Sequence, residues 1–98
     1  MDELIRFQTD RGLDKKPFDL LNETASVFEE LLEAAGYDVP KDSRPALKEE
    51  LNNFVIHLIN NNVAVLSDEG KTNYGQVDAF TDIIVFATGA ILKLGHDP

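Results

Sequence analysis

A cluster of three glutamates is the part of this sequence best suited to chemistry. Glu33 follows Glu29 by four residues and Glu30 by three. No lysine or arginine occurs in residues 22–39. On a helix these spacings bring side chains together, and each like-charged pair destabilises the helix by roughly 0.2–0.5 kcal/mol. A solvated acidic surface would account for the cluster, and so would a bound cation.

A second acidic pair lies near the other end of the chain. Asp78 and Asp82 repeat the four-residue spacing. Asp78 falls near the expected start of a helix, where the helix dipole favours an anion. Asp82 is one turn deeper, between Phe80 and Ile83, and a carboxylate in apolar surroundings needs a cation. The only basic residue on this segment is Lys93, three turns away.

The two clusters together suit a metal ion. If they face each other, carboxylates about 4 Å apart repel by up to ~4 kcal/mol at an effective dielectric constant of 20. Protons or a divalent cation must relieve that repulsion. A ligand set of oxygens without histidine or cysteine favours Mg²⁺ or Mn²⁺. Carboxylates that project from helices into a bundle are an established way of building such sites.

The elements that must position these carboxylates are helices. Apolar periodicity predicts four helical segments and no strand. Residues 63–66 are interpreted as a helix tail or a buried loop. The predicted helices span residues 2–11, 19–35, 43–60 and 76–94; the predicted caps are Asp19 and Ser43, and the predicted stops are Gly12, Gly36 and Gly95. We therefore expect one all-α domain over residues 1–98, a small four-helix bundle completed by oligomerisation.

Composition limits the choice of partner. The chain has 98 residues, a net charge of −9 and no cysteine. The charge repels a phosphate backbone or an anionic membrane, so we expect neither nucleic acid nor membrane as a partner. The start of the chain has no signal-peptide pattern, which predicts a cytoplasmic protein. Residues 83–92 are uncharged, too short to span a bilayer, and expected to contact another copy of the chain.

Two segments resemble a known enzyme family. FEELLEAAGY (28–37) matches the E-E-x-x-E motif of the MazG-like, all-α nucleoside triphosphate pyrophosphohydrolases. VDAFTDIIVFATGAILKLGHDP (77–98) is similar to the last core helix of that superfamily, in the branch whose motif is D-A-x-x-D. NETASVFEELLEA (22–34) resembles the compact members carried by phages and mobile elements.

The resemblance implies a reaction. Family members hydrolyse nucleoside or deoxynucleoside triphosphates between the α and β phosphates, giving a monophosphate and pyrophosphate. They need Mg²⁺, assemble as dimers or tetramers, and are often interpreted as house-cleaning enzymes. Carried over, Glu29 and Glu30 are the catalytic candidates that orient or activate water. Glu30, Glu33 and Asp82 become metal ligands.

Three points stay open at the level of sequence. Asp78 is one candidate for the fourth ligand, and Glu50 is another, because Glu50 and Asn53 imitate the E-x-x-D motif of relatives. The substrate's phosphates need cations, for which Lys41, Lys48 and Lys93 are candidates. Lys93, Asn22 and Phe7, whose ring could stack on a base, are the candidate substrate-binding residues. The alternative function is a non-catalytic, acidic helical module that binds a basic protein partner.

Overall fold

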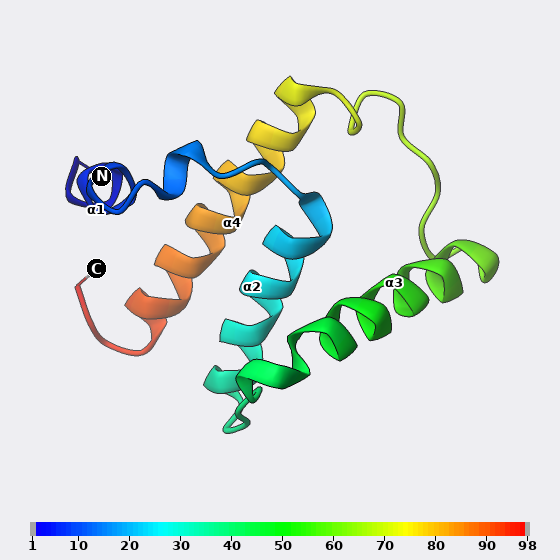
Figure 1. The fold of residues 1–98 in the computed structure, drawn as a ribbon, viewed down its shortest axis with the longest axis horizontal. Coiled ribbons are helices and arrows are strands. Elements are labelled where there is room, and N and C mark those ends of the chain that lie inside the picture. Colours follow the sequence, from blue (N-terminus) through cyan, green and yellow to red (C-terminus); the bar gives the residue numbers. More distant parts are fainter. Residues whose placement is uncertain (1, 98) are drawn as a thin grey trace. The chain divides into compact units, whose positions relative to one another are not determined.

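The computed structural model describes residues 2–97, and these form helices and loops without any strand. The expectation of an all-α chain is confirmed. The described residues form four α-helices and two short 3-10 turns, and Figure 1 labels the α-helices. They are α1 (Asp2–Asp10), η1 (Leu13–Lys15), α2 (Leu20–Ala34), η2 (Lys41–Ser43), α3 (Arg44–Asn60) and α4 (Asn73–Lys93).

The chain divides into two compact units. The first ends at Asn61 and holds α1, α2 and α3. The second begins at Asn62 and holds α4.

The ends of the first three helices follow mostly from single residues. Asp19 caps α2, because its carboxylate accepts the backbone N–H of Asn22 at 3.2 Å. Gly36 follows α2 with φ at 95°, a left-handed conformation that glycine adopts without strain. The prediction that Ser43 caps α3 is wrong. Ser43 closes η2 in a right-handed helical conformation and makes no capping hydrogen bond, whereas a capping residue is normally extended.

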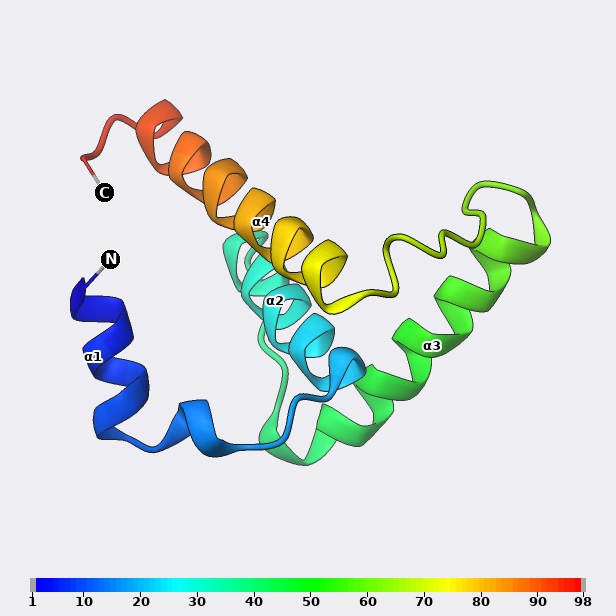
Figure 2. The same cartoon turned by 90° about the horizontal axis from the view of Figure 1, so that it is seen from above.

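Helices α2 and α3 contact each other over a short stretch. The two buried residues of the described chain lie on these helices. Ala25 is 0% exposed and Leu51 is 7% exposed, and no other described residue is buried. On α2, the apolar side chains of Leu21, Phe28 and Leu32 are half-buried. In Figures 1 and 2 the C-terminal half of α3 extends away from α2.

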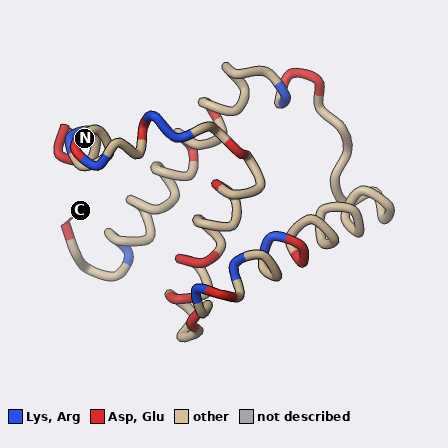
Figure 3. The backbone as a smooth tube through the Cα atoms, in the orientation of Figure 1, with Lys and Arg blue, Asp and Glu red and all other residues tan. Residues whose placement is uncertain are grey.

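That divergence leaves much of the apolar face of α3 without cover. Phe54 and Val55 are 52% and 46% exposed. Residues 51–67 carry no lysine, arginine, aspartate or glutamate, as the uniform colour of this segment in Figure 3 shows. The surface of α3 after Leu51 therefore has no acidic or basic side chain apart from His57, and it combines exposed apolar residues with asparagines.

Helix α4 begins three residues earlier than the sequence predicts. The Thr72 hydroxyl accepts the backbone N–H of Gly75 at 3.0 Å, so the cap lies before the predicted start of the helix at residue 76. Gly75 permits this start, because a Cβ there would stand 2.3 Å from the carbonyl oxygen of Glu69. Residues 63–66 form a loop, as one of the two interpretations had it. The loop is not buried, since Val63 and Val65 are 71% and 78% exposed.

No residue of α4 is buried within the described chain. Phe86, in the uncharged stretch of residues 83–92, is 76% exposed. By length and composition alone, α4 is also the one described helix that could cross a membrane. Its uncharged stretch spans about 15 Å at 1.5 Å per residue, half the thickness of a bilayer's hydrocarbon core.

Candidate functional site

The glutamate cluster occupies the second half of α2. Glu29 is half-buried, whereas Glu30 and Glu33 are exposed. The difference has a geometric cause: successive helix positions differ by about 100°, so neighbouring residues lie on different sides of the helix. Glu29 lies on the side that α3 approaches.

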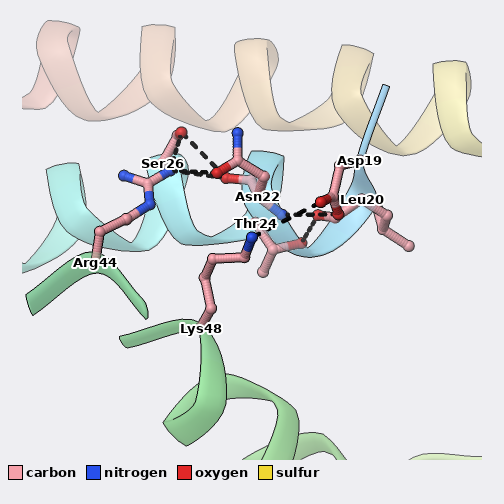
Figure 4. A network of polar contacts seen from close by, with 7 residues as sticks. All are labelled: Asp19, Leu20, Asn22, Thr24, Ser26, Arg44 and Lys48. Atoms are coloured by element: carbon pink, nitrogen blue, oxygen red, sulfur yellow. Dashed lines mark hydrogen bonds and ion pairs between the residues drawn. The ribbon is translucent and has the colours of Figure 1, made fainter. Parts of the chain in front are cut away.

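Arg44, the first residue of α3, engages Glu29. Its Nη1 donates to Glu29 Oε2 at 2.6 Å, and both side chains are 27% exposed. Its Nη2 donates to Ser26 Oγ at 2.5 Å and to the Asn22 carbonyl oxygen at 2.9 Å. Figure 4 shows Arg44 reaching Ser26 and Asn22, and Lys48 Nζ lies 3.7 Å from Asp19 Oδ2. The cluster therefore has a cation, supplied from outside its own helix.

Arg44 could not be identified from spacing within α2, because the cation that reaches Glu29 comes from another helix. Arg44 stands fifteen residues after Glu29, at the start of the next helix. One feature of the sequence indicates that a partner binds this face of α2. Asn22, Ser26 and Glu29 recur at intervals of four and three residues, which places three hydrogen-bonding groups on one face of α2.

Glu30 and Glu33 keep their negative charges close together. The pKa of Glu33 is raised, first by the charge of Glu30, then by desolvation and a hydrogen bond with Glu30, and less by Glu29 and Asp38. Among the described residues, no salt bridge joins Glu30 or Glu33 to a cation. These two carboxylates form the uncompensated part of the cluster.

The donor chemistry of this pair fits a hard cation, but the number of donors falls short. Carboxylate oxygens are the ligands that Mg²⁺ uses in proteins. Across residues 2–97, no group of three or more acidic or histidine side chains is gathered that could hold a metal ion. Glu50, exposed on α3, does not complete such a group with Glu30 and Glu33. Any metal bound here needs further ligands.

The two aspartates of the second unit lie one turn apart on α4. Asp78 and Asp82 are both exposed. The interpretation of Asp82 as a buried carboxylate in need of a cation is not borne out within the described residues. Asp78 lines a shallow hollow together with Ser67, Tyr74 and Gly75, which flank the start of the helix.

The candidate substrate-binding residues have separate surroundings. Phe7 on α1 is 49% exposed, and the Arg11 guanidinium lies 4.4 Å from its ring centroid. Asn22 lines a hollow that also contains Lys16 and Lys48. Lys93 is exposed in the last turn of α4. A smaller hollow beside Glu29 and Arg44 contains Lys41.

Comparisons with protein-family models, with curated proteins and with solved structures each found no match.

Proposed function

We propose that this protein is a Mg²⁺-dependent pyrophosphohydrolase that cleaves nucleoside or deoxynucleoside triphosphates between the α and β phosphates, with a house-cleaning role in the cytoplasm. The observation that carries the proposal is that Glu30 and Glu33 lie one turn apart and exposed on α2, without a salt bridge to any cation among the described residues. Both residues belong to the segment that resembles the E-E-x-x-E motif. A divalent cation would relieve their repulsion.

The acidic residues have two proposed roles, metal binding and the orientation of water. Glu30 and Glu33 bind Mg²⁺, with Asp82 and either Asp78 or Glu50 as further ligands. Glu30 and Glu29 orient the attacking water. The metal, when bound, neutralises charge on the phosphates and sets them in line with the water.

The proposed enzyme is a homodimer or homotetramer. Two buried residues are too small a core for a chain of this length, and small domains depend on oligomerisation when their own core is insufficient. The exposed apolar residues of α3 and α4 supply the surface for association. Lys41, Lys48 or Lys93 would hold the triphosphate, and Asn22 and Phe7 the nucleoside.

Variants of single carboxylates test this function. Glu33→Gln and Asp82→Asn each keep the shape of the side chain and remove one negative charge. Each should lower the rate of Mg²⁺-dependent pyrophosphate release at least ~10²-fold, the cost of losing one preorganised electrostatic contact. Glu49→Gln, an exposed glutamate on α3, is the control and should match the parent. Full activity in Glu33→Gln would refute the proposal.

A second candidate is a non-catalytic helical module whose acidic surface binds a basic protein. It is favoured by the exposure of Glu30 and Glu33 and by the lack of a three-donor metal cluster in the described part of the chain. Such a module needs no Mg²⁺. Equal melting temperatures in millimolar Mg²⁺ and in EDTA, together with no pyrophosphate release, would select it.

A further inference from the structure

One face of α4 carries an acid at one end and a base at the other. Asp82, Phe86, Gly89 and Lys93 recur at intervals of four, three and four residues. At about 100° per residue, these positions lie within about 60° of one another around the helix. Asp82 and Lys93 bound the uncharged stretch of residues 83–92 and stand about 16 Å apart along the helix axis. We call these four residues the α4 strip.

The two central positions of the α4 strip differ in bulk. Phe86 is 76% exposed, so its ring has little cover within the described chain. A Cβ at Gly89 would meet no other part of the described chain within 4 Å. A glycine inside a helix is unfavourable because it loses more conformational freedom on folding than any other residue, but it permits the close approach of another segment. The α4 strip thus offers a large ring and, one turn away, an unfilled position.

We propose that the α4 strip packs against the same strip of a second copy of the chain, with the two helices antiparallel. A two-fold axis midway between residues 87 and 88 sets residues equally far from that midpoint opposite each other. Phe86 then lies opposite the partner's Gly89, and Asp82 lies opposite the partner's Lys93. Each ring fills the space beside a glycine, and an ion pair closes each end of the contact.

The inference rests on the proposed function only for its assembly of two or more copies, and it needs neither a metal nor catalysis. It also bears on the proposed site. The pairing brings the partner's Lys93, a candidate for binding the triphosphate, to the side of Asp82.

The charges favour this arrangement over a parallel one. In a parallel pair Asp82 would face Asp82 and Lys93 would face Lys93, and like charges in contact are costly. In the antiparallel pair each acid faces a base. Among residues 2–97, no salt bridge engages Asp82 or Lys93, so both charges are available to a second chain. A bilayer fits less well, because the charges stand about 16 Å apart, roughly half the thickness of the hydrocarbon core.

Cross-linking tests the direction of the pairing, and the chain suits it because it contains no cysteine. Asp82→Cys and Lys93→Cys are refolded separately and together, then treated with a thiol cross-linker whose reach of about 10 Å falls short of the ~16 Å between the two ends of the strip. In an antiparallel pair only the mixed dimer brings two thiols opposite each other. The mixture should therefore give at least ~10-fold more cross-linked dimer than either variant alone. Equal cross-linking of a variant with itself, or none in the mixture, would overturn the proposal.

Substitutions test the contacts of the strip through the Kd of the dimer, measured by sedimentation equilibrium. Gly89→Leu should raise this Kd at least ~10-fold, because the added side chain occupies the place of the partner's ring. Ala87→Leu, exposed on another side of the helix, is the matched control and should leave the Kd unchanged. Equal effects of the two would contradict the contact.

A charge exchange tests the ion pairs by the same measurement. Asp82→Lys should raise the Kd roughly tenfold, because it replaces two attractions in the dimer with two repulsions. The double variant Asp82→Lys/Lys93→Asp should recover the Kd of the parent, since acid and base face each other again. A double variant that associates no better than Asp82→Lys would overturn the antiparallel pairing.

These outcomes separate the inference from the proposed function. A parent that sediments as a single chain contradicts the inference and the proposed assembly together. A protein that releases pyrophosphate but whose mixture does not cross-link overturns the inference alone. A protein that cross-links in the mixture but releases no pyrophosphate refutes the proposed function and supports the interface.

Discussion

At the scale of single residues, Glu33 is an exposed carboxyl whose pKa is raised, first by the negative charge of Glu30. Its raised pKa means that the folded protein holds the Glu33 proton more tightly than the unfolded chain does. The contribution to stability is therefore fully present below the unfolded pKa. This contribution is lost as the pH rises through the raised pKa of the folded state. At neutral pH the ionised Glu33 therefore lowers the free energy of unfolding.

Glu33→Gln removes that cost. In EDTA at pH 7 the variant should melt at a higher temperature than the parent, and the difference should vanish below about pH 4, where glutamates are protonated in both states. Thermal melts of both proteins across this pH range provide the measurement. A variant that is less stable than the parent at pH 7 would contradict the repulsion between Glu30 and Glu33.

The residue types of the site could be predicted from the sequence, but the pairing within it could not. Spacing along α2 correctly brings Glu30 and Glu33 together, since contacts three residues apart are fixed by helix geometry. The partner of Glu29 depends on how α3 approaches α2. The spacing of residues within one helix carries no information about that approach. The assignment of Glu50 or Asp78 as fourth ligand has the same difficulty and stays a prediction.

At the scale of elements, the start of α4 depends on one hydroxyl. The Thr72 side chain caps the helix by accepting the N–H of Gly75. Thr72→Ala should therefore cost about 1 kcal/mol and reduce helical circular dichroism. Thr81→Ala is the matched control, because the Thr81 hydroxyl bonds back to the Val77 carbonyl oxygen within the helix and caps nothing. Equal losses in the two variants would show that the cap contributes nothing.

Ala25 is the most buried of the described residues, at 0% exposed, and it lies on α2, which contacts α3. Ala25→Leu should destabilise the protein by roughly 1–3 kcal/mol, because added methyl groups have no space in a packed contact. Ala46→Leu places the same side chain at an exposed position of α3 and should change stability by no more than about 0.5 kcal/mol. Urea unfolding of both variants gives the comparison. An Ala25→Leu variant as stable as the parent would mean that α2 and α3 do not pack as described.

Most element boundaries followed from the sequence for identifiable reasons. Gly12, Gly36 and Gly95 adopt positive φ angles where helices were predicted to stop. The predicted start of the last helix at Gln76 was wrong, and Ser43, although it directly precedes α3, makes no capping hydrogen bond. In both cases the deciding factor was local backbone geometry: a 3-10 turn runs into α3, and Gly75 passes close to Glu69. The periodicity of apolar residues reflects which side chains are buried. It therefore predicts neither the 3-10 turn before α3 nor the close approach of Gly75 to Glu69.

At the scale of the whole molecule, each of the two units has apolar surface of its own. Large apolar side chains on α3 and α4 are exposed, among them Phe54 at 52% and Phe86 at 76%. The uncharged stretch of residues 83–92 indicates a need for cover, and the sequence alone does not say which chain supplies it. We expect a second copy to supply it, in an assembly with two-fold symmetry.

Sedimentation at micromolar concentration should therefore give twice or four times the mass of one chain, which is 10.9 kDa. Phe86→Glu should shift the population toward single chains, because a charge in a buried apolar interface is costly. Tyr74→Glu makes a similar change outside the uncharged stretch of α4 and should leave the mass unchanged. A parent that sediments as one chain would contradict the expected assembly.

The most direct test of the proposed function is product analysis with the unaltered protein. Each of a panel of nucleoside and deoxynucleoside triphosphates is incubated with the protein in millimolar Mg²⁺ and, in parallel, in EDTA. We predict nucleoside monophosphate and pyrophosphate in equal amounts from at least one substrate, with Mg²⁺ only. Release of diphosphate and inorganic phosphate, or no product from any substrate in Mg²⁺, would contradict a pyrophosphohydrolase.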